Sequence, residues 1–102
     1  MTNLTRMKRI ELLLEEALVP RLAKIVRESG FSGHTIMPVL SGAGGRGAWQ
    51  DERLTNSSRV MLLAIGPQED ADRLLAALRP LMDDYRLLLT IGDVEVLRHD
   101  HF

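Results

Sequence analysis

The spacing of apolar residues in the first half of the chain predicts a strand, a helix and a second strand. Residues 8–14 alternate imperfectly between apolar and polar side chains, as a strand does. From residue 18 to residue 29 the apolar positions recur at helical spacing, with Pro20 suited to a first turn and Gly30 to a stop. Residues 33–40 then form a short run that is rich in β-formers.

The second half of the chain repeats this order. Residues 58–65 are a short apolar run of strand length. A helix is expected over residues 67–82, with Pro80 kinking or ending it. Residues 85–99 are expected to form one interrupted strand, or two short strands, around a glycine and an aspartate at positions 92 and 93.

A strand, a helix and a strand used twice within about a hundred residues match the ferredoxin-like βαββαβ arrangement. This is an α+β sandwich in which two helices cover one face of a four-stranded sheet. A chain of 102 residues has the size of one domain with a modest core. We therefore expect a single domain spanning residues 1–102.

The strand expected at residues 58–65 is apolar on both of its faces. Val60, Leu62 and Ala64 have one parity, and Met61, Leu63 and Ile65 have the other. Two helices cover only one face of a sheet, so the second face needs another layer, and a closed homo-oligomer supplies it most simply. The alternative is that the second face is merely half buried at a sheet edge.

The overall composition excludes several classes of partner. Thirteen Lys and Arg residues against fourteen Asp and Glu give a formal net charge of -1, which offers no general attraction to nucleic acid or anionic membrane. The chain has no cysteine, which excludes disulfides, thiolate metal sites and thiol nucleophiles. Glu11, Glu15 and Glu16 interrupt the first apolar run, and no stretch approaches membrane-spanning length. We expect a cytoplasmic protein that neither binds nucleic acid nor inserts into a membrane.

A long polar stretch, LSGAGGRGAWQDERLTNSS at residues 40–58, separates the two halves. A loop of this length is uncommon in a compact domain unless it binds something or is disordered. Its glycines at positions 42, 44, 45 and 47 permit positive φ and let N–H groups converge on an anion, to which Arg46 adds a planar guanidinium. The alternative is a flexible loop in which the glycines only provide slack. Residues 42–47 also satisfy the pattern GxGxxG, but a poor helix follows, so a dinucleotide site is rejected.

Serine and aspartate residues form no recognisable catalytic set. Ser41, Ser57 and Ser58 have no base and orienting partner at a suggestive spacing. Asp83 and Asp84 are adjacent, so their side chains point in different directions. We predict no catalytic residues.

The histidines provide only a weak metal hypothesis. His99 and His101 flank Asp100 at the C-terminus, a placement that is more typical of a solvated tail than of a metal site. His34 is expected to be structural or to lie at a subunit contact. Trp49, in the long loop, is expected to contact a protein partner.

The order of these features resembles the PII signalling proteins. The stretch MKRIELLLEEALVPRLAKIVRESGFSGHTIMPVLSGAGGRG is similar to their amino-terminal half, which leads into a Gly-rich start of a mobile T-loop. The stretch DDYRLLLTIGDVEVLRHDHF is similar to the branch linked to inorganic carbon, which includes the carboxysome-associated PII protein and regulators of bicarbonate transporters. The resemblance spans Met7 to Phe102 and rests on the order of the motifs.

The resemblance implies a homotrimer with nucleotides in the clefts between subunits and with a T-loop at about residues 42–58. The nucleotide-binding residues are then expected to be Thr35, Gly42, Gly44, Gly45, Arg46, Leu89, Thr90, Ile91 and Gly92. Bicarbonate or another anion is assigned to Gly45, Arg46 and Arg59. The part of the loop that binds a protein partner is assigned to Trp49 and Arg53.

Two departures from the PII pattern refine this picture. Nitrogen-regulatory PII proteins carry a T-loop tyrosine that is uridylylated, whereas Tyr85 is the only tyrosine in this chain. Their second loop also supplies a lysine and glycines to the outer phosphates of ATP, and here it offers only Arg86 and Gly92. AMP or ADP is therefore favoured over ATP.

The sequence thus predicts a sensor that is not an enzyme and carries no cofactor. Adenine nucleotide with bicarbonate would set the order of the T-loop, which would regulate a bicarbonate transporter or another component of carbon uptake or carboxysome-linked metabolism. Two alternatives stay open. One is a small enzyme that hydrolyses or transfers nucleotides on the same fold, and the other is a trimeric metal-binding adaptor that uses His99 and His101.

Overall fold

The chain alternates strands and helices along its length. The computed structural model describes residues 3–44, 47–50 and 58–97. Its elements are β1 (Thr5–Glu15), η1 (Glu16–Leu18), α1 (Val19–Glu28), β2 (Thr35–Val39), β3 (Ser41–Gly44), β4 (Gly47–Gln50), β5 (Arg59–Gly66), α2 (Gln68–Leu78), η3 (Arg79–Leu81) and β6 (Leu88–Val96).

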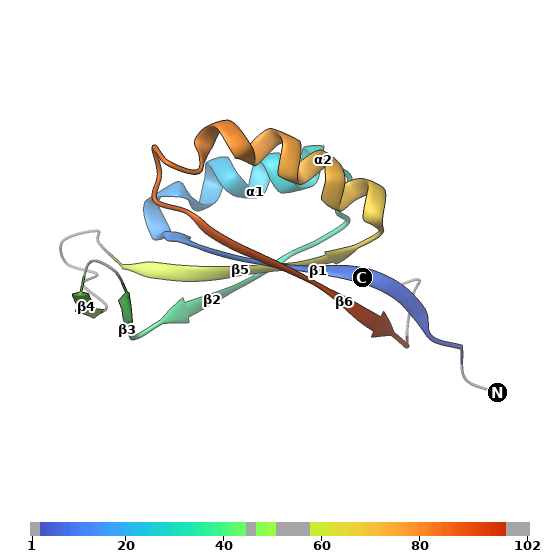
Figure 1. The fold of residues 1–102 in the computed structure, drawn as a ribbon, viewed down its shortest axis with the longest axis horizontal. Helices are drawn as coiled ribbons and strands as arrows, with labels where there is room; N and C mark the ends of the chain where they lie inside the picture. The colour runs from blue at the N-terminus through green and yellow to red at the C-terminus, as the bar shows by residue number, and fades with distance from the viewer. Residues whose placement is uncertain (1–2, 45–46, 51–57, 98–102) are drawn as a thin grey trace.

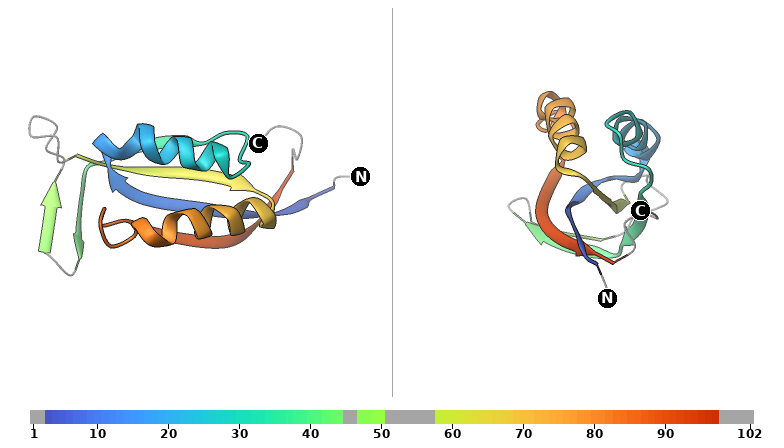
Figure 2. Two further views of the ribbon diagram at one scale, coloured as in Figure 1. Left: turned by 90° about the horizontal axis from the view of Figure 1, so that it is seen from above. Right: turned by 90° about the vertical axis from the view of Figure 1, so that its right-hand side faces the viewer.

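Four strands form one antiparallel sheet in the order β2-β5-β1-β6, and both helices lie over one of its faces (Figure 1, Figure 2). This arrangement is the predicted α+β ferredoxin-like fold. Neither helix of the described chain has the length and apolar character that a membrane span requires.

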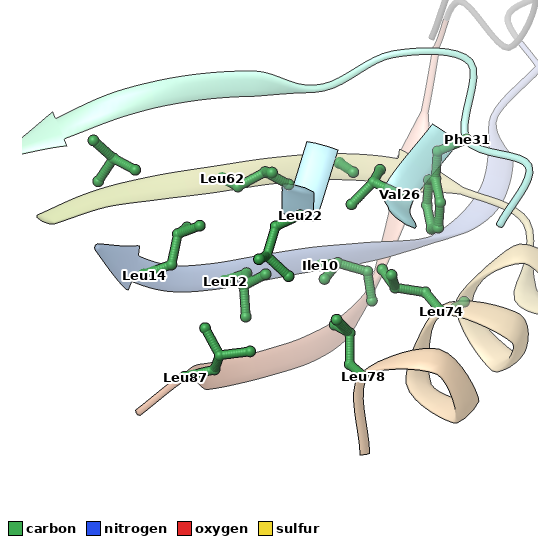
Figure 3. Packing of buried hydrophobic residues seen from close by; sticks show 13 residues of the cluster. Ile10, Leu12, Leu14, Leu22, Val26, Phe31, Leu62, Leu74, Leu78 and Leu87 are labelled. Atoms are coloured by element: carbon green, nitrogen blue, oxygen red, sulfur yellow. The ribbon is translucent and has the colours of Figure 1, made fainter. Parts of the chain in front are cut away.

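The core lies between the two helices and the inner face of the sheet (Figure 3). The alternate residues of the two central strands that point into it are at most 3% exposed: Ile10, Leu12, Leu14, Val60, Leu62 and Ala64. The helices add Leu22 and Val26 of α1, and Leu74 and Leu78 of α2. Burial of one such side chain stabilises the fold by about 1.5–3 kcal/mol, so this layer is the main source of stability.

The opposite side of the sheet, here called the open face, has no helix over it in the described chain (Figure 2). Leu13, Met61, Leu63 and Ile65 point to this side from the central strands and are half buried. Leu88 of β6 is directly opposite Leu13 and is 59% exposed. The prediction that β5 is apolar on both faces while the helices cover only one is confirmed.

The predicted interruption of the last strand is wrong. β6 runs from Leu88 to Val96 without a break, and both residues at the expected interruption pair with the central strand, Gly92 with Arg9 and Asp93 with Lys8. Glycine and aspartate have low strand propensity. The continuous ladder with β1 outweighs that local preference.

The T-loop region also contains structure that the sequence pattern did not predict. β3 and β4 form a separate two-stranded hairpin, in which Gly42 pairs with Trp49 and Gly44 with Gly47. These glycines have extended backbone, so the convergent nest of N–H groups expected at positions 42, 44 and 47 is not formed there. A ladder fixes alternating directions for successive N–H groups, which is the physical reason for the difference.

The helix predictions are nearly correct. Pro20 lies in the first turn of α1, after the short 3₁₀ turn η1. α2 ends at Leu78, and Pro80 lies in the following 3₁₀ turn, so this proline follows the helix rather than kinking it. A proline without an N–H group is tolerated in such a first turn.

Gly30 ends α1 and lets the two helices meet closely. Its φ is 114°, a value that side-chain-bearing residues rarely adopt. Arg73 of α2 donates its Nε to the carbonyl of Ser29 at 2.9 Å and forms an ion pair with Asp70. A Cβ on Gly30 would lie 2.6 Å from Oδ1 of Asp70, so only glycine fits beside this pair.

We expect Gly30→Ala to lower the free energy of unfolding by about 2 kcal/mol or more, because it combines left-handed backbone with a clash. Urea denaturation measures the change. Gly33→Ala is the matched control, since nothing lies within 4 Å of a Cβ at that position. Equal stability of the two variants would contradict this account of the helix contact.

Candidate functional site

The two edge strands of the four-stranded sheet, β2 and β6, carry five of the predicted nucleotide-binding residues, at opposite sides of the sheet. Thr35 of β2 pairs with Leu63, Leu63 pairs with Glu11, and Glu11 pairs with Thr90 of β6. The four residues therefore form one row across the open face. Three strand spacings separate the two threonines, a distance of about 14 Å.

The four residues predicted on β6 divide between the two faces of the sheet. Thr90 and Gly92 point to the open face, opposite Glu11 and Arg9. Leu89 and Ile91 have the other parity. Leu89 packs against the core, which gives it a structural role, and Ile91 is 43% exposed.

A single chain does not bring Thr35 together with Thr90 and Gly92. Among the described residues, no atom outside Gly92 and its two chain neighbours lies within 4 Å of where a Cβ of Gly92 would be. The space above this glycine is therefore open with respect to that part of the chain. A site that used residues of both edges would have to be completed by a second copy.

The T-loop residues are only partly within the described chain. Gly42 and Gly44 lie in β3, and the backbone of Trp49 lies in β4. Arg59 begins β5, where it is opposite Glu15 of β1 and Val39 of β2. Outside the described residues lie Gly45, Arg46, Arg53, His99 and His101.

The connection between η3 and β6, residues 82–87, is a tight turn held against α1. Arg21 donates an Nη1 hydrogen bond of 2.5 Å to the Tyr85 hydroxyl, and its guanidinium carbon lies 5.1 Å from the centre of the Tyr85 ring. The Leu87 N–H group donates to the carbonyl of Met82 at 3.2 Å. This turn lies at the same end of the sheet as the β3–β4 hairpin (Figure 1, Figure 2).

Arg86, in that turn, has a φ of 52°. The left-handed region is unfavourable for an arginine, and such outliers concentrate at binding sites. Neither this strain nor the contact between Arg21 and Tyr85, which are 64 positions apart, has a signal in the sequence pattern. The resemblance already points to Arg86, but its strained backbone and the contact that holds the turn against α1 are features that the sequence did not predict.

An ion pair lies beside Gly92 on the other face of the sheet. Lys8 Nζ lies 2.5 Å from Oδ1 of Asp93. The hydrogen bond from Lys8 and its positive charge lower the pKa of Asp93 below its ordinary value. The positive charge of Lys8 offsets the negative charge of Asp93, so the pair adds no net charge beside the predicted nucleotide stretch.

The described residues contain no group of three or more histidine, aspartate and glutamate side chains placed to hold a metal ion. His34 is half exposed and directly precedes β2. The metal hypothesis for the two C-terminal histidines stays untested, because both fall beyond the last described residue.

Comparison with known families identifies the chain. Residues 7–101 match the family described as nitrogen regulatory protein P-II. The chain therefore belongs to the PII family. No curated protein sequence matches it.

Solved structures of PII-like proteins are similar over nearly the whole chain. CPII, a nitrogen regulatory PII-like protein from Thiomonas intermedia K12 bound to ADP, AMP and bicarbonate, is 25% identical with a TM-score of 0.87, over 96% of this chain and 94% of that chain. CPII bound to ADP and bicarbonate is 26% identical with a TM-score of 0.85, over 96% and 95%. A protein from Thermus thermophilus, described as PII-like, is 25% identical with a TM-score of 0.79, over 98% of both chains.

Replacement of Arg86 by glycine should raise the free energy of unfolding by about 1 kcal/mol, because glycine relieves the left-handed strain. Thermal and urea unfolding measure the effect. Arg79→Gly, at a residue with φ of -50°, is the control and should be destabilising. A destabilised Arg86→Gly variant would show that the arginine is needed by the fold itself.

Proposed function

We propose that this PII-family chain is a sensor that binds adenine nucleotide, AMP or ADP in preference to ATP, together with bicarbonate. The support comes from the CPII structures, which hold ADP, AMP and bicarbonate and are similar to nearly the whole of this chain. The proposed unit is a single PII-like domain over residues 1–102, and it acts without catalysing a reaction.

The binding site is proposed to lie between subunits of a homotrimer. Thr35 and the Thr90–Gly92 stretch stand at opposite edges of one sheet, so one copy provides only half of a cleft that uses both. The apolar open face provides the reason for assembly, because exposure of a large apolar patch is unfavourable. This separation of the two halves is the single observation in the structure that most supports the proposal.

Anion contacts are proposed for the T-loop and for its base. Gly45 and Arg46 would hold phosphate or bicarbonate, together with Arg59, which begins β5 at the end of the loop. Gly42 and Gly44 would shape the approach from β3. On β6 the backbone of Leu89 and Ile91 would flank the nucleotide, because their side chains lie on the helix-covered face and Leu89 packs against the core. Arg86 is a further candidate for phosphate, since its backbone is strained in the turn before β6.

The T-loop is proposed to report ligand binding to a protein target. A ligand shifts the conformation of the loop only if it binds one conformation of the loop more tightly than another. Ordering the backbone of each loop residue costs roughly 1–2 kcal/mol of conformational entropy. Trp49 and Arg53 would contact that target. By resemblance to the carbon-linked and carboxysome-associated branch, the target is proposed to be a bicarbonate transporter or another carbon-uptake component.

Replacement of Arg46 by alanine should weaken nucleotide binding about tenfold to a hundredfold, because a charge-assisted contact contributes roughly 1.5–3 kcal/mol. Calorimetric titration with AMP, ADP and ATP, each with and without bicarbonate, measures the loss. Arg46→Lys should recover only part of the affinity, since an ammonium group lacks the two-pronged geometry. Arg27→Ala, at an exposed position on α1, is the control and should leave binding unchanged.

Equal affinities of wild type and Arg46→Ala in every condition would show that the loop holds no anion. Absence of a binding signal for all three nucleotides would overturn the proposed function as a whole. Chromatography of the nucleotide after each titration tests the alternative in which the protein is an enzyme, which predicts conversion of the ligand.

A further inference from the structure

Arg9 and Glu11 place two opposite charges within the apolar part of the open face. Both belong to β1, and they point to the same side because they are two positions apart. The apolar residues that share this side on the central strands are Met7, Leu13, Met61, Leu63 and Ile65. A charged pair among such side chains requires a physical explanation, because the water around it is lost when the face is covered.

Neither neighbouring strand offers these two residues an opposite charge. Arg9 lies between Ile65 of β5 and Gly92 of β6. Glu11 lies between Leu63 of β5 and Thr90 of β6, as described for the row across the open face. Within the described chain, the only opposite charge beside either residue on this face is therefore the other residue of the pair, on β1.

The contact between the two side chains is weak. Arg9 Nη2 lies 3.4 Å from Oε2 of Glu11, and the side chains are 45% and 37% exposed. A guanidinium has five N–H donors and a carboxylate has about four acceptor positions, so one long contact satisfies little of either group. If the open face is covered, further partners of opposite charge are needed.

The surface beside Arg9 leaves room for such a partner. Gly92 is next to it on β6, and nothing lies within 4 Å of where its Cβ would be. Glycine inside a strand weakens the strand and often marks the close approach of another chain. This open position leaves space beside Arg9 for a group from a second copy.

We infer that Arg9 of one copy pairs with Glu11 of the next copy, so that the open face recognises copies of itself. This inference rests on the proposed trimer. The face carries both charges, so it is complementary to a second copy of the same chain. In a closed ring each copy offers Arg9 to one neighbour and Glu11 to the other. Ion pairs of this kind select register and partner more than they add stability.

Charge reversal tests this pairing. Arg9→Glu alone and Glu11→Arg alone should each weaken assembly, because like charges would then face each other across the interface. The double variant, Arg9→Glu with Glu11→Arg, should form trimers as the wild type does. When wild type and double variant are refolded together and resolved by native mass spectrometry, the trimers should contain one kind of chain.

The control reverses an ion pair away from the open face. Lys24 and Glu28 lie four residues apart on α1, with Nζ and Oε2 3.9 Å apart and with both side chains mostly exposed. The variant Lys24→Glu with Glu28→Lys should mix freely with wild type. Mass differences between the chains identify the mixed trimers.

The outcomes separate this inference from the proposed function. Free mixing of wild type with the Arg9/Glu11 double variant would overturn the inference while leaving the trimer intact. A monomeric wild type would overturn both. Glu11→Gln, which keeps the shape of the side chain, should raise the dissociation constant of the trimer about tenfold. Unchanged assembly of that milder variant would also overturn the inference, whether or not the double variant folds.

Discussion

The apolar open face of the sheet is the constraint on which the other features depend. The helices and the inner face bury one parity of β1 and β5 almost completely, while the other parity is left half buried. Within residues 3–44, 47–50 and 58–97, a sheet of four strands with two helices on one side has no further element to cover that face. The proposed assembly follows from this imbalance rather than from any single contact.

The same constraint explains why the candidate site is divided. The fold places β2 and β6 at opposite edges, and each carries part of the predicted nucleotide site. A ligand held between copies stabilises the assembled state by mass action, so occupancy and assembly are coupled. The T-loop leaves the sheet after β2, which is one of the two edge strands that carry part of the predicted site.

Local signals predicted most of the fold. The short apolar run of β5, Pro20 at the start of α1 and Gly30 at its end each depend on neighbouring residues only. The continuity of β6 was missed because Gly92 and its neighbour are poor strand formers, and only the ladder with β1 holds them. The β3–β4 hairpin was missed for a related reason, since its glycines indicated a loop.

The site was less predictable because its geometry depends on strand order. No spacing along the chain places Thr35 and Thr90 in one row, as the pairing of four strands does. The contact between Arg21 and Tyr85 likewise arises only when α1 packs beside the turn, and the left-handed backbone of Arg86 has no signal in the sequence pattern. Residue types can therefore indicate a class of ligand, whereas the division of the site between the two edges of the sheet can be recognised only from the strand order in the structure.

The mass of the wild-type protein in solution tests the central claim most directly. Light scattering coupled to size-exclusion chromatography at micromolar concentration should give three times the chain mass of 11.4 kDa, because the open face is then covered. A well-folded monomer at that concentration would contradict the account, since it would show that the half-buried apolar residues of β1 and β5 are stable in contact with water.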